Sequence, residues 1–99
     1  MVIAGVPRLD VYVAEHCFGC GEARRLAEAA ARRYPRVAVR VVDLERDPQA
    51  RPDSLVAVPT YMLDGRVIAL GNPRHGELFR RLEDALTERP IEESTACPP

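Results

Sequence analysis

The sequence predicts one α/β domain, in which a strand-helix-strand unit is followed by a hairpin and a final helix. An alternating strand pattern leads into a long helical period and then into a second apolar run, which is the order of a right-handed β-α-β unit. Further along, two apolar runs flank Asp64-Gly65, a strong hairpin signal. The length of 99 residues suits a single domain with a modest core.

The first strand is expected over residues 9–13 and the first helix over residues 18–34. In the strand, Leu9, Val11 and Val13 alternate with Asp10 and Tyr12, so the two sets lie on opposite faces. Pro35 stops the helix, because a proline cannot donate the next helical hydrogen bond. The expected buried stripe of the helix is Ala23, Leu26, Ala27, Ala30 and Tyr34.

The middle of the chain is expected to complete the sheet. Residues 37–42 are almost continuously apolar, as in a parallel strand covered on both faces. Residues 43–57 contain Pro48 and Pro52, which predict a short helix or two separate turns. Residues 58–63 and 66–70 form the two antiparallel strands of the hairpin.

The last helix is expected to begin near Asn72 as N-cap, with Pro73 in its first turn, and to end at Pro90. Residues 1–8 then form a lead-in, residues 9–88 the domain and residues 89–99 a flexible tail. The apolar stripe of this helix is Leu78, Phe79, Leu82, Ala85 and Leu86.

The pair Cys17 and Cys20 stands where the first strand gives way to the helix. The first N–H groups of a helix lack helical partners, and the helix dipole is positive at that end. A thiolate is therefore stabilised there. We interpret Cys17 as the attacking thiol and Cys20, about one helical turn further on, as the resolving thiol.

Cys-x-x-Cys alone leaves two other interpretations open. Half of a zinc site has the same spacing; the only other cysteine, Cys97, stands alone, but His16 and His75 could complete a set of four ligands. The two thiols could also be inert.

Composition excludes several partners. The formal net charge is −1, and the arginines are interspersed with acidic residues, so neither nucleic acid nor a membrane surface is expected. The apolar start of the chain is too short for a signal peptide. Three cysteines lack the spacing of a disulfide framework, which predicts the reducing cytoplasm.

A second motif, Val58-Pro59-Thr60, lies just before the hairpin. Together with Cys17-Phe18-Gly19-Cys20, and with the elements between them in the same order, it resembles the thioredoxin/glutaredoxin superfamily over roughly residues 9–88. The resemblance implies β-α-β-(short α)-β-β-α with a four-stranded mixed sheet flanked by helices.

The resemblance also assigns roles to residues. Cys17 matches the nucleophile and Cys20 the resolving thiol, Pro59 the cis-proline, and Val58 the residue whose backbone pairs with an extended substrate; Thr60 completes that substrate-binding segment. The implied activity is that of a thiol-disulfide oxidoreductase acting on protein or small-molecule disulfides. It requires no cofactor or metal, it is regenerated by an external reductase or thiol, and a monomer suffices. A non-catalytic binding module and a metal- or cluster-binding protein are the alternatives.

The sequence departs from both thioredoxins and glutaredoxins near these motifs. His16 stands where thioredoxins have tryptophan, and Val11 where they have a buried aspartate. The glycine pair of glutaredoxins is replaced by Ala69-Leu70-Gly71-Asn72. The subfamily and glutathione dependence are therefore left open. His16, Phe18 and Gly19, beside or between the cysteines, are the candidates for altering their reactivity.

Overall fold

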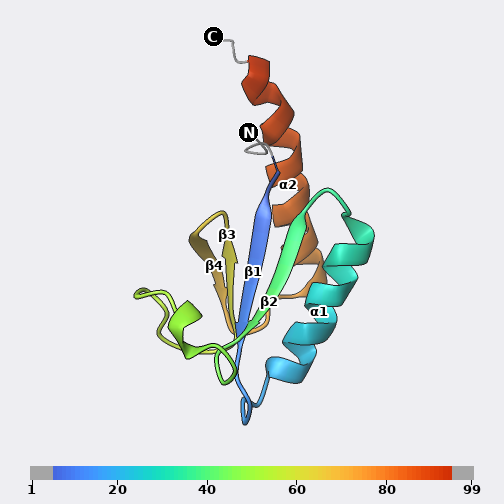
Figure 1. The fold of residues 1–99 in the computed structure, drawn as a ribbon. Helices are drawn as coiled ribbons and strands as arrows, with labels where there is room; N and C mark the ends of the chain where they lie inside the picture. The colour runs from blue at the N-terminus through green and yellow to red at the C-terminus, as the bar shows by residue number, and fades with distance from the viewer. Residues whose placement is uncertain (1–5, 95–99) are drawn as a thin grey trace.

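The computed structural model describes the backbone of residues 6–94 and the side chains of residues 6–87. Its strands and helices lie in the order that the sequence predicts (Figure 1). They are β1 Arg8–Val13, α1 Cys20–Arg33, β2 Ala38–Asp43, the 3₁₀ turn η2 Pro48–Ala50, β3 Thr60–Leu63, β4 Arg66–Leu70 and α2 His75–Ser94.

The strands form one mixed sheet in the order β2-β1-β3-β4 (Figure 1). β1 and β2 are parallel, with Val11 opposite Val41, which confirms the β-α-β unit. β3 is antiparallel to both β1 and β4, and the β3–β4 register shifts at Tyr61 and Met62. The turn between β3 and β4 has positive φ at both Asp64 (52°) and Gly65 (85°). Such a two-residue turn matches the twist of a hairpin, so the predicted hairpin is also confirmed.

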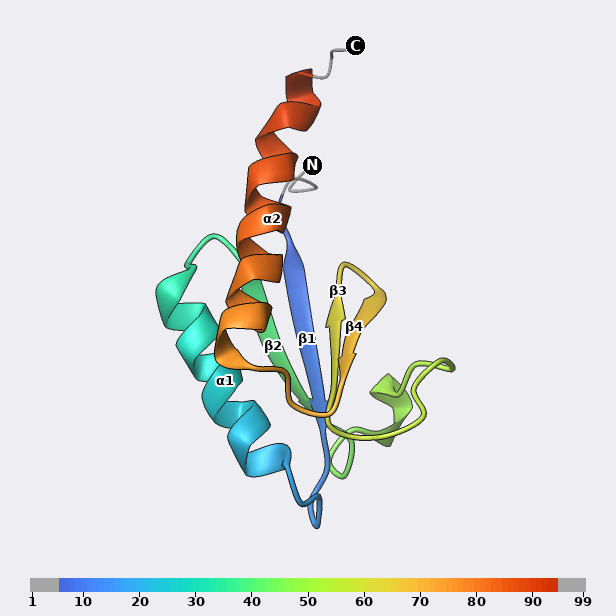
Figure 2. The same cartoon turned by 180° about the vertical axis from the view of Figure 1, so that it is seen from behind.

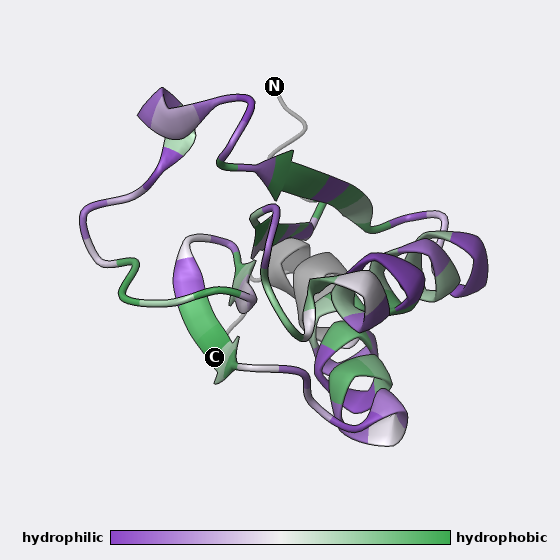
Figure 3. Cartoon of the chain, turned by 90° about the horizontal axis from the view of Figure 1, so that it is seen from below, coloured by the Kyte–Doolittle hydropathy of each residue, from purple (hydrophilic) through white to green (hydrophobic). Residues whose placement is uncertain are grey.

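Both helices pack on the same face of the sheet (Figure 2). Alternation along β1 directs Leu9, Val11 and Val13 to this face, where none of the three side chains is exposed. The strands are coloured mainly as hydrophobic, whereas the helices carry mixed stripes (Figure 3). The predicted stripes of both helices face this core. Its fully buried or nearly buried members include Ala23, Leu26, Ala27, Ala30, Tyr34, Tyr61, Leu78 and Leu82.

The other face of the sheet is covered by the segment between β2 and β3. A smaller apolar cluster there joins Tyr12 and Met62 of the sheet to Leu44 and Leu55 of that segment. The segment contains only the single 3₁₀ turn η2 as regular structure, in place of a short α-helix. Pro52 accounts for this, because it removes a backbone donor that a helix continuing from Pro48 would need.

Asp10 is buried on that second face, with 1% of its surface exposed. Its carboxylate accepts hydrogen bonds from Nε of Arg8 and Nε of Arg40, each at 3.1 Å. The buried charge is therefore paired on both oxygens, while the two arginine side chains remain more than half exposed. Val11, which stands where thioredoxins have a buried aspartate, is fully buried on the other face of the sheet, the one that the helices cover.

Three expectations about these elements were wrong. β2 is an edge strand and Val41 is 36% exposed, so β2 is not covered on both faces; its apolar run reflects β propensity rather than burial. α2 begins at His75, not near Asn72, because Glu77 Oε1 accepts a hydrogen bond from the Arg74 N–H and closes the helix start there.

The third correction concerns Pro90, which does not end α2; the helix continues to Ser94. Proline removes one donor but holds a φ compatible with a helix, so residues 89–94 are helical rather than part of a tail. The remainder of the expected tail, with Cys97, lies outside the described residues, as does most of the lead-in.

The hydrogen bonds of Asp43, the last residue of β2, can be tested by titrating its carboxyl group. Its carboxylate accepts hydrogen bonds from the Glu45 backbone N–H at 2.9 Å and from Nη2 of Arg24 at 3.1 Å. The Glu45 hydrogen bond, and then the Arg24 guanidinium, hold the pKa of Asp43 below its ordinary value. Asp43 therefore adds stability above the pKa of an unfolded aspartate, and this contribution disappears as the pH falls through the folded pKa.

We expect an NMR titration of the Asp43 carboxyl carbon to give a midpoint below that of an unperturbed aspartate. Arg24→Met removes the guanidinium and leaves the Glu45 N–H, so the midpoint should rise part of the way toward the ordinary value. Arg25→Met, one residue along, is the matched control and should leave the midpoint in place. Equal midpoints in the wild type and the Arg24→Met protein would contradict the assigned cause.

Candidate functional site

The two cysteines of the Cys-x-x-Cys motif form a disulfide in the structure, with Cα atoms 5.3 Å apart. Cys20 is the first residue of α1, and Gly19 is its N-cap. The Cys20 N–H donates to the Cys17 carbonyl at 3.2 Å, which folds the loop back toward the helix. The sulfur of Cys17 therefore lies at the positive end of the α1 dipole, although Cys17 itself precedes the helix.

The two cysteines differ in burial. Cys20 is 3% exposed and belongs to the main core, whereas Cys17 is half-buried at the edge of that core. An incoming disulfide can approach the half-buried residue more readily than the buried one. This difference gives the two cysteines unequal access to solvent, and thiol reactivity depends on such access.

The Val58–Pro59 segment lies against the cysteine loop. Its peptide bond is cis. A Cβ placed on Gly19 would lie 3.7 Å from Cδ of Pro59, so the proline ring lies next to this residue between the cysteines. The structure thus brings together two motifs that are at least 38 positions apart in sequence.

A backbone hydrogen bond joins Pro59 to Gly71, the residue that follows β4. The Pro59 carbonyl accepts the Gly71 N–H at 2.8 Å, and Gly71 adopts a positive φ of 84° to present it. Thr60 is fully buried, and its hydroxyl donates to the Ala57 carbonyl at 2.6 Å. The Thr60 side chain is thus used internally, and Val58, half-buried next to Pro59, is the member of this segment nearest to solvent.

The other predicted site residues lie at the surface. Phe18 has a relative exposure of 107%, so its whole ring stands in solvent between the two cysteines. His16 is exposed and has a positive φ of 43°, in the turn that leads from β1 to Cys17. Two further apolar residues near the Pro59 segment are exposed. Val56, two residues before Val58 in sequence, has a relative exposure of 73%, and Leu70, opposite Thr60 in the sheet, has one of 63%.

Sequence reasoning missed two residues of this region, Asn72 and Tyr61. The Tyr61 hydroxyl donates to Oδ1 of Asn72 at 2.7 Å, and Nδ2 of Asn72 donates to the Gly19 carbonyl at 2.9 Å. Burial raises the pKa of the Tyr61 phenol, and the negative charge of Glu22 raises it further, so the phenol is a neutral donor. An asparagine before a proline is typical of a helix cap, and no local pattern points to a partner 53 residues away.

Neither His16 nor His75 forms a metal-binding group with the two cysteines in the described part of the chain. His75 lies in the first turn of α2 and stacks on Phe79, with ring centroids 4.1 Å apart. Within the described part of the chain, no group of three or more His, Cys, Asp or Glu side chains could hold a metal ion. Among the same residues, no helix is both long and apolar enough to cross a membrane.

Comparison with known proteins gives matches in structure but not in sequence. No family model matches the chain, and no curated protein is detectably similar to it in sequence. A thioredoxin from Fasciola hepatica is similar in structure, with 22% identity, a TM-score of 0.68 and 82% of each chain covered.

A second similar chain comes from a structure that addresses the thiol resolving mechanism in a yeast mitochondrial 1-Cys peroxiredoxin via glutathione and thioredoxin systems. The identity is 20% and the TM-score 0.64, covering 80% of this chain and 78% of that chain. These structural matches are consistent with the order of the strands in the sheet and with the packing of both helices on one of its faces. The chain therefore has a thioredoxin-like fold that carries a disulfide-bonded Cys17–Cys20 pair.

Proposed function

We propose that the protein is a thiol-disulfide oxidoreductase that exchanges disulfides through Cys17 and Cys20. The observation that carries this proposal is the pairing of the two sulfurs at the start of α1, with Cys17 the more accessible cysteine and Gly19 of the same loop lying next to Pro59. A permanent structural staple would not need an accessible first cysteine. The alternative of a pure binding module leaves the second thiol without a role.

The exchange proceeds in two steps. The Cys17 thiolate attacks one sulfur of a substrate disulfide, and the other sulfur leaves as a thiolate that takes up a proton. Cys20 then loses its proton and attacks Cys17 of the mixed disulfide, releasing the second substrate thiol. The substrate gains two electrons and two protons, and Cys17 and Cys20 become the disulfide seen in the structure.

The surroundings of Cys17 assist the first step. The positive end of the α1 dipole favours the thiolate over the thiol. A protonated His16 would act in the same direction, and it would make the disulfide form more oxidising. Val58 supplies the backbone along which an extended substrate lies, because within residues 6–94 no backbone hydrogen bond of the structure engages it.

The exposed apolar residues favour a protein substrate over a small one. Phe18 stands wholly in solvent beside the disulfide, where its ring offers a large apolar contact area to a protein partner. Both cysteines and the Val58–Pro59 segment belong to one chain, so a monomer suffices. We place the cycle in a reducing compartment such as the cytoplasm, where an external reductase or thiol regenerates the dithiol.

The proposal is tested by mass spectrometry of the intact protein after equilibration over a range of reduced-to-oxidised glutathione ratios. We expect a single transition in which Cys17 and Cys20 together lose two hydrogen atoms, with a midpoint in the range of about −270 to −120 mV known for dithiol proteins. Thiols that stay reduced at every ratio, or a metal mass that persists in the native spectrum, would contradict the proposal.

A further inference from the structure

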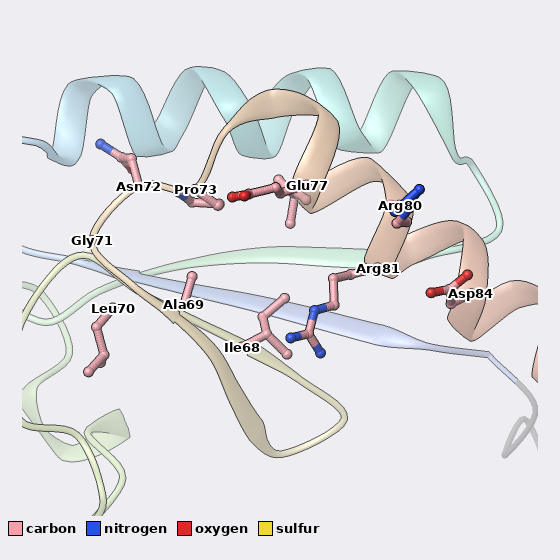
Figure 4. Close-up of a pocket in the computed structure, with 11 residues that line it drawn as sticks. Ile68, Ala69, Leu70, Gly71, Asn72, Pro73, Glu77, Arg80, Arg81 and Asp84 are labelled. Atoms are coloured by element: carbon pink, nitrogen blue, oxygen red, sulfur yellow. The ribbon is translucent and has the colours of Figure 1, made fainter.

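The Asn72 side chain bridges the sheet and the cysteine loop. Its Oδ1 accepts the hydroxyl of Tyr61 from β3, and its Nδ2 donates to the carbonyl of Gly19, the residue before Cys20. Gly71, Asn72 and Pro73 border a cavity between β4 and α2, and the Asn72 side chain points from this border toward the start of α1 (Figure 4). One amide thus connects two segments that the chain brings together from distant positions.

The orientation of this amide is determined by its partners. Tyr61 is fully buried, so its hydroxyl needs a hydrogen-bond partner, and Oδ1 of Asn72 provides it. Reversing the amide would place Oδ1 against the Gly19 carbonyl, two acceptors facing each other. Tyr61 therefore directs the Asn72 N–H donor toward the loop between the cysteines.

The Gly19 peptide is closely held by this contact. Its carbonyl accepts both Nδ2 of Asn72 at 2.9 Å and the Ala23 N–H at 3.1 Å. A Cβ on Gly19 would lie 3.0 Å from Nδ2 of Asn72, tighter than ordinary contacts, so a side chain at this position would push the Asn72 amide away by a few tenths of an ångström. The peptide that is held in this way leads directly into Cys20.

We propose that Asn72 is a positioning residue for disulfide exchange, which acts by fixing the Gly19–Cys20 peptide so that Cys20 stays within reach of Cys17. The inference rests on the proposed function, and Asn72 itself needs no contact with substrate. Holding two reacting groups together raises their effective concentration. Asn72 therefore favours closure of the Cys17–Cys20 disulfide over mixed disulfides with external thiols.

The test measures the equilibrium constant between dithiol and disulfide in glutathione buffers for the wild type, Asn72→Ala and Asn72→Asp. Asn72→Asp keeps an oxygen for Tyr61 but turns a negative oxygen toward the Gly19 carbonyl. We expect the constant for disulfide closure to fall about threefold to tenfold in Asn72→Ala, the range of one hydrogen bond, and at least as far in Asn72→Asp. A tenfold fall corresponds to about 30 mV.

A second readout separates positioning from general loosening of the fold. After loading Cys17 with glutathione, the rate at which Cys20 releases it should fall by a similar factor, while the rate at which Cys17 reacts with iodoacetamide should change by less than about twofold. Gln49→Ala, an exposed amide in η2, is the matched control and should leave all three quantities unchanged.

The outcomes are distinguishable. If the wild type shows no dithiol-disulfide transition, the proposed function fails. If the wild type interconverts and the folded Asn72 variants keep its equilibrium constant and release rate, only the role of Asn72 is refuted. Should both Asn72 variants fail to fold, Asn72→Ser decides: it removes the amide that donates to the Gly19 carbonyl and keeps a small polar side chain, and a closure constant equal to that of the wild type overturns the inference.

Discussion

The Cys20→Ser protein is expected to accumulate mixed disulfides with its substrates, all of them through Cys17, whereas the Cys17→Ser protein forms none. Cys17 is the more accessible of the two residues, and Cys20 is 3% exposed within the core. Without Cys20 the mixed disulfide cannot be resolved from within the chain, so it persists. Without Cys17 the first attack is lost, and turnover should fall by roughly a hundredfold or more.

The measurement is mass spectrometry of each variant after incubation with a disulfide-containing protein, followed by peptide mapping of the trapped bond. Both variants are made in a Cys97→Ser background, so that the third cysteine of the chain cannot resolve or cap Cys17. Trapping through Cys20 in the Cys17→Ser protein would reverse the assigned roles. Equal and undiminished binding of partners by both variants, with no trapped bond, would support a binding module instead.

The periodic parts of the chain were predictable because each obeys a local rule. Alternation fixed the faces of β1, so that Val11 is buried among the helices and Asp10 lies on the opposite face. The 3.6-residue period gave the buried stripes of α1 and α2. Asp64 and Gly65 specified the hairpin because only residues that tolerate positive φ suit its turn.

The parts that were not predictable depend on partners far away in sequence. The apolar run of β2 could not show that this strand lies at the sheet edge, since edge position depends on the order of all four strands. Asn72 has the local signature of a cap, but its amide is engaged by Tyr61 and Gly19. The pairing of Cys17 with Cys20 was accessible from spacing, yet the proximity of Gly19 to Pro59 required the assembled fold.

Leu82→Ala is expected to cause a large loss of stability. Leu82, on α2, is fully buried in the same cluster as Leu9, Val11 and Tyr61 of the sheet. Truncating a buried leucine removes its transfer free energy and leaves a cavity, which together lower the free energy of unfolding by about 2–5 kcal/mol. Small domains have only about 5–15 kcal/mol in total, so this single change removes a large share of it.

Leu70→Ala is the matched control, because it makes the same chemical change at a residue that is 63% exposed on the edge strand β4. Its effect on the free energy of unfolding should stay within about 0.5 kcal/mol. Urea unfolding followed by circular dichroism measures both variants against the wild type, with the disulfide kept oxidised throughout. Similar losses at the two leucines would mean that α2 does not cover the sheet as described. A large loss confined to Leu82 would show that α2, which follows directly from the Asn72 segment, is packed firmly enough to hold that segment in place beside the cysteine loop.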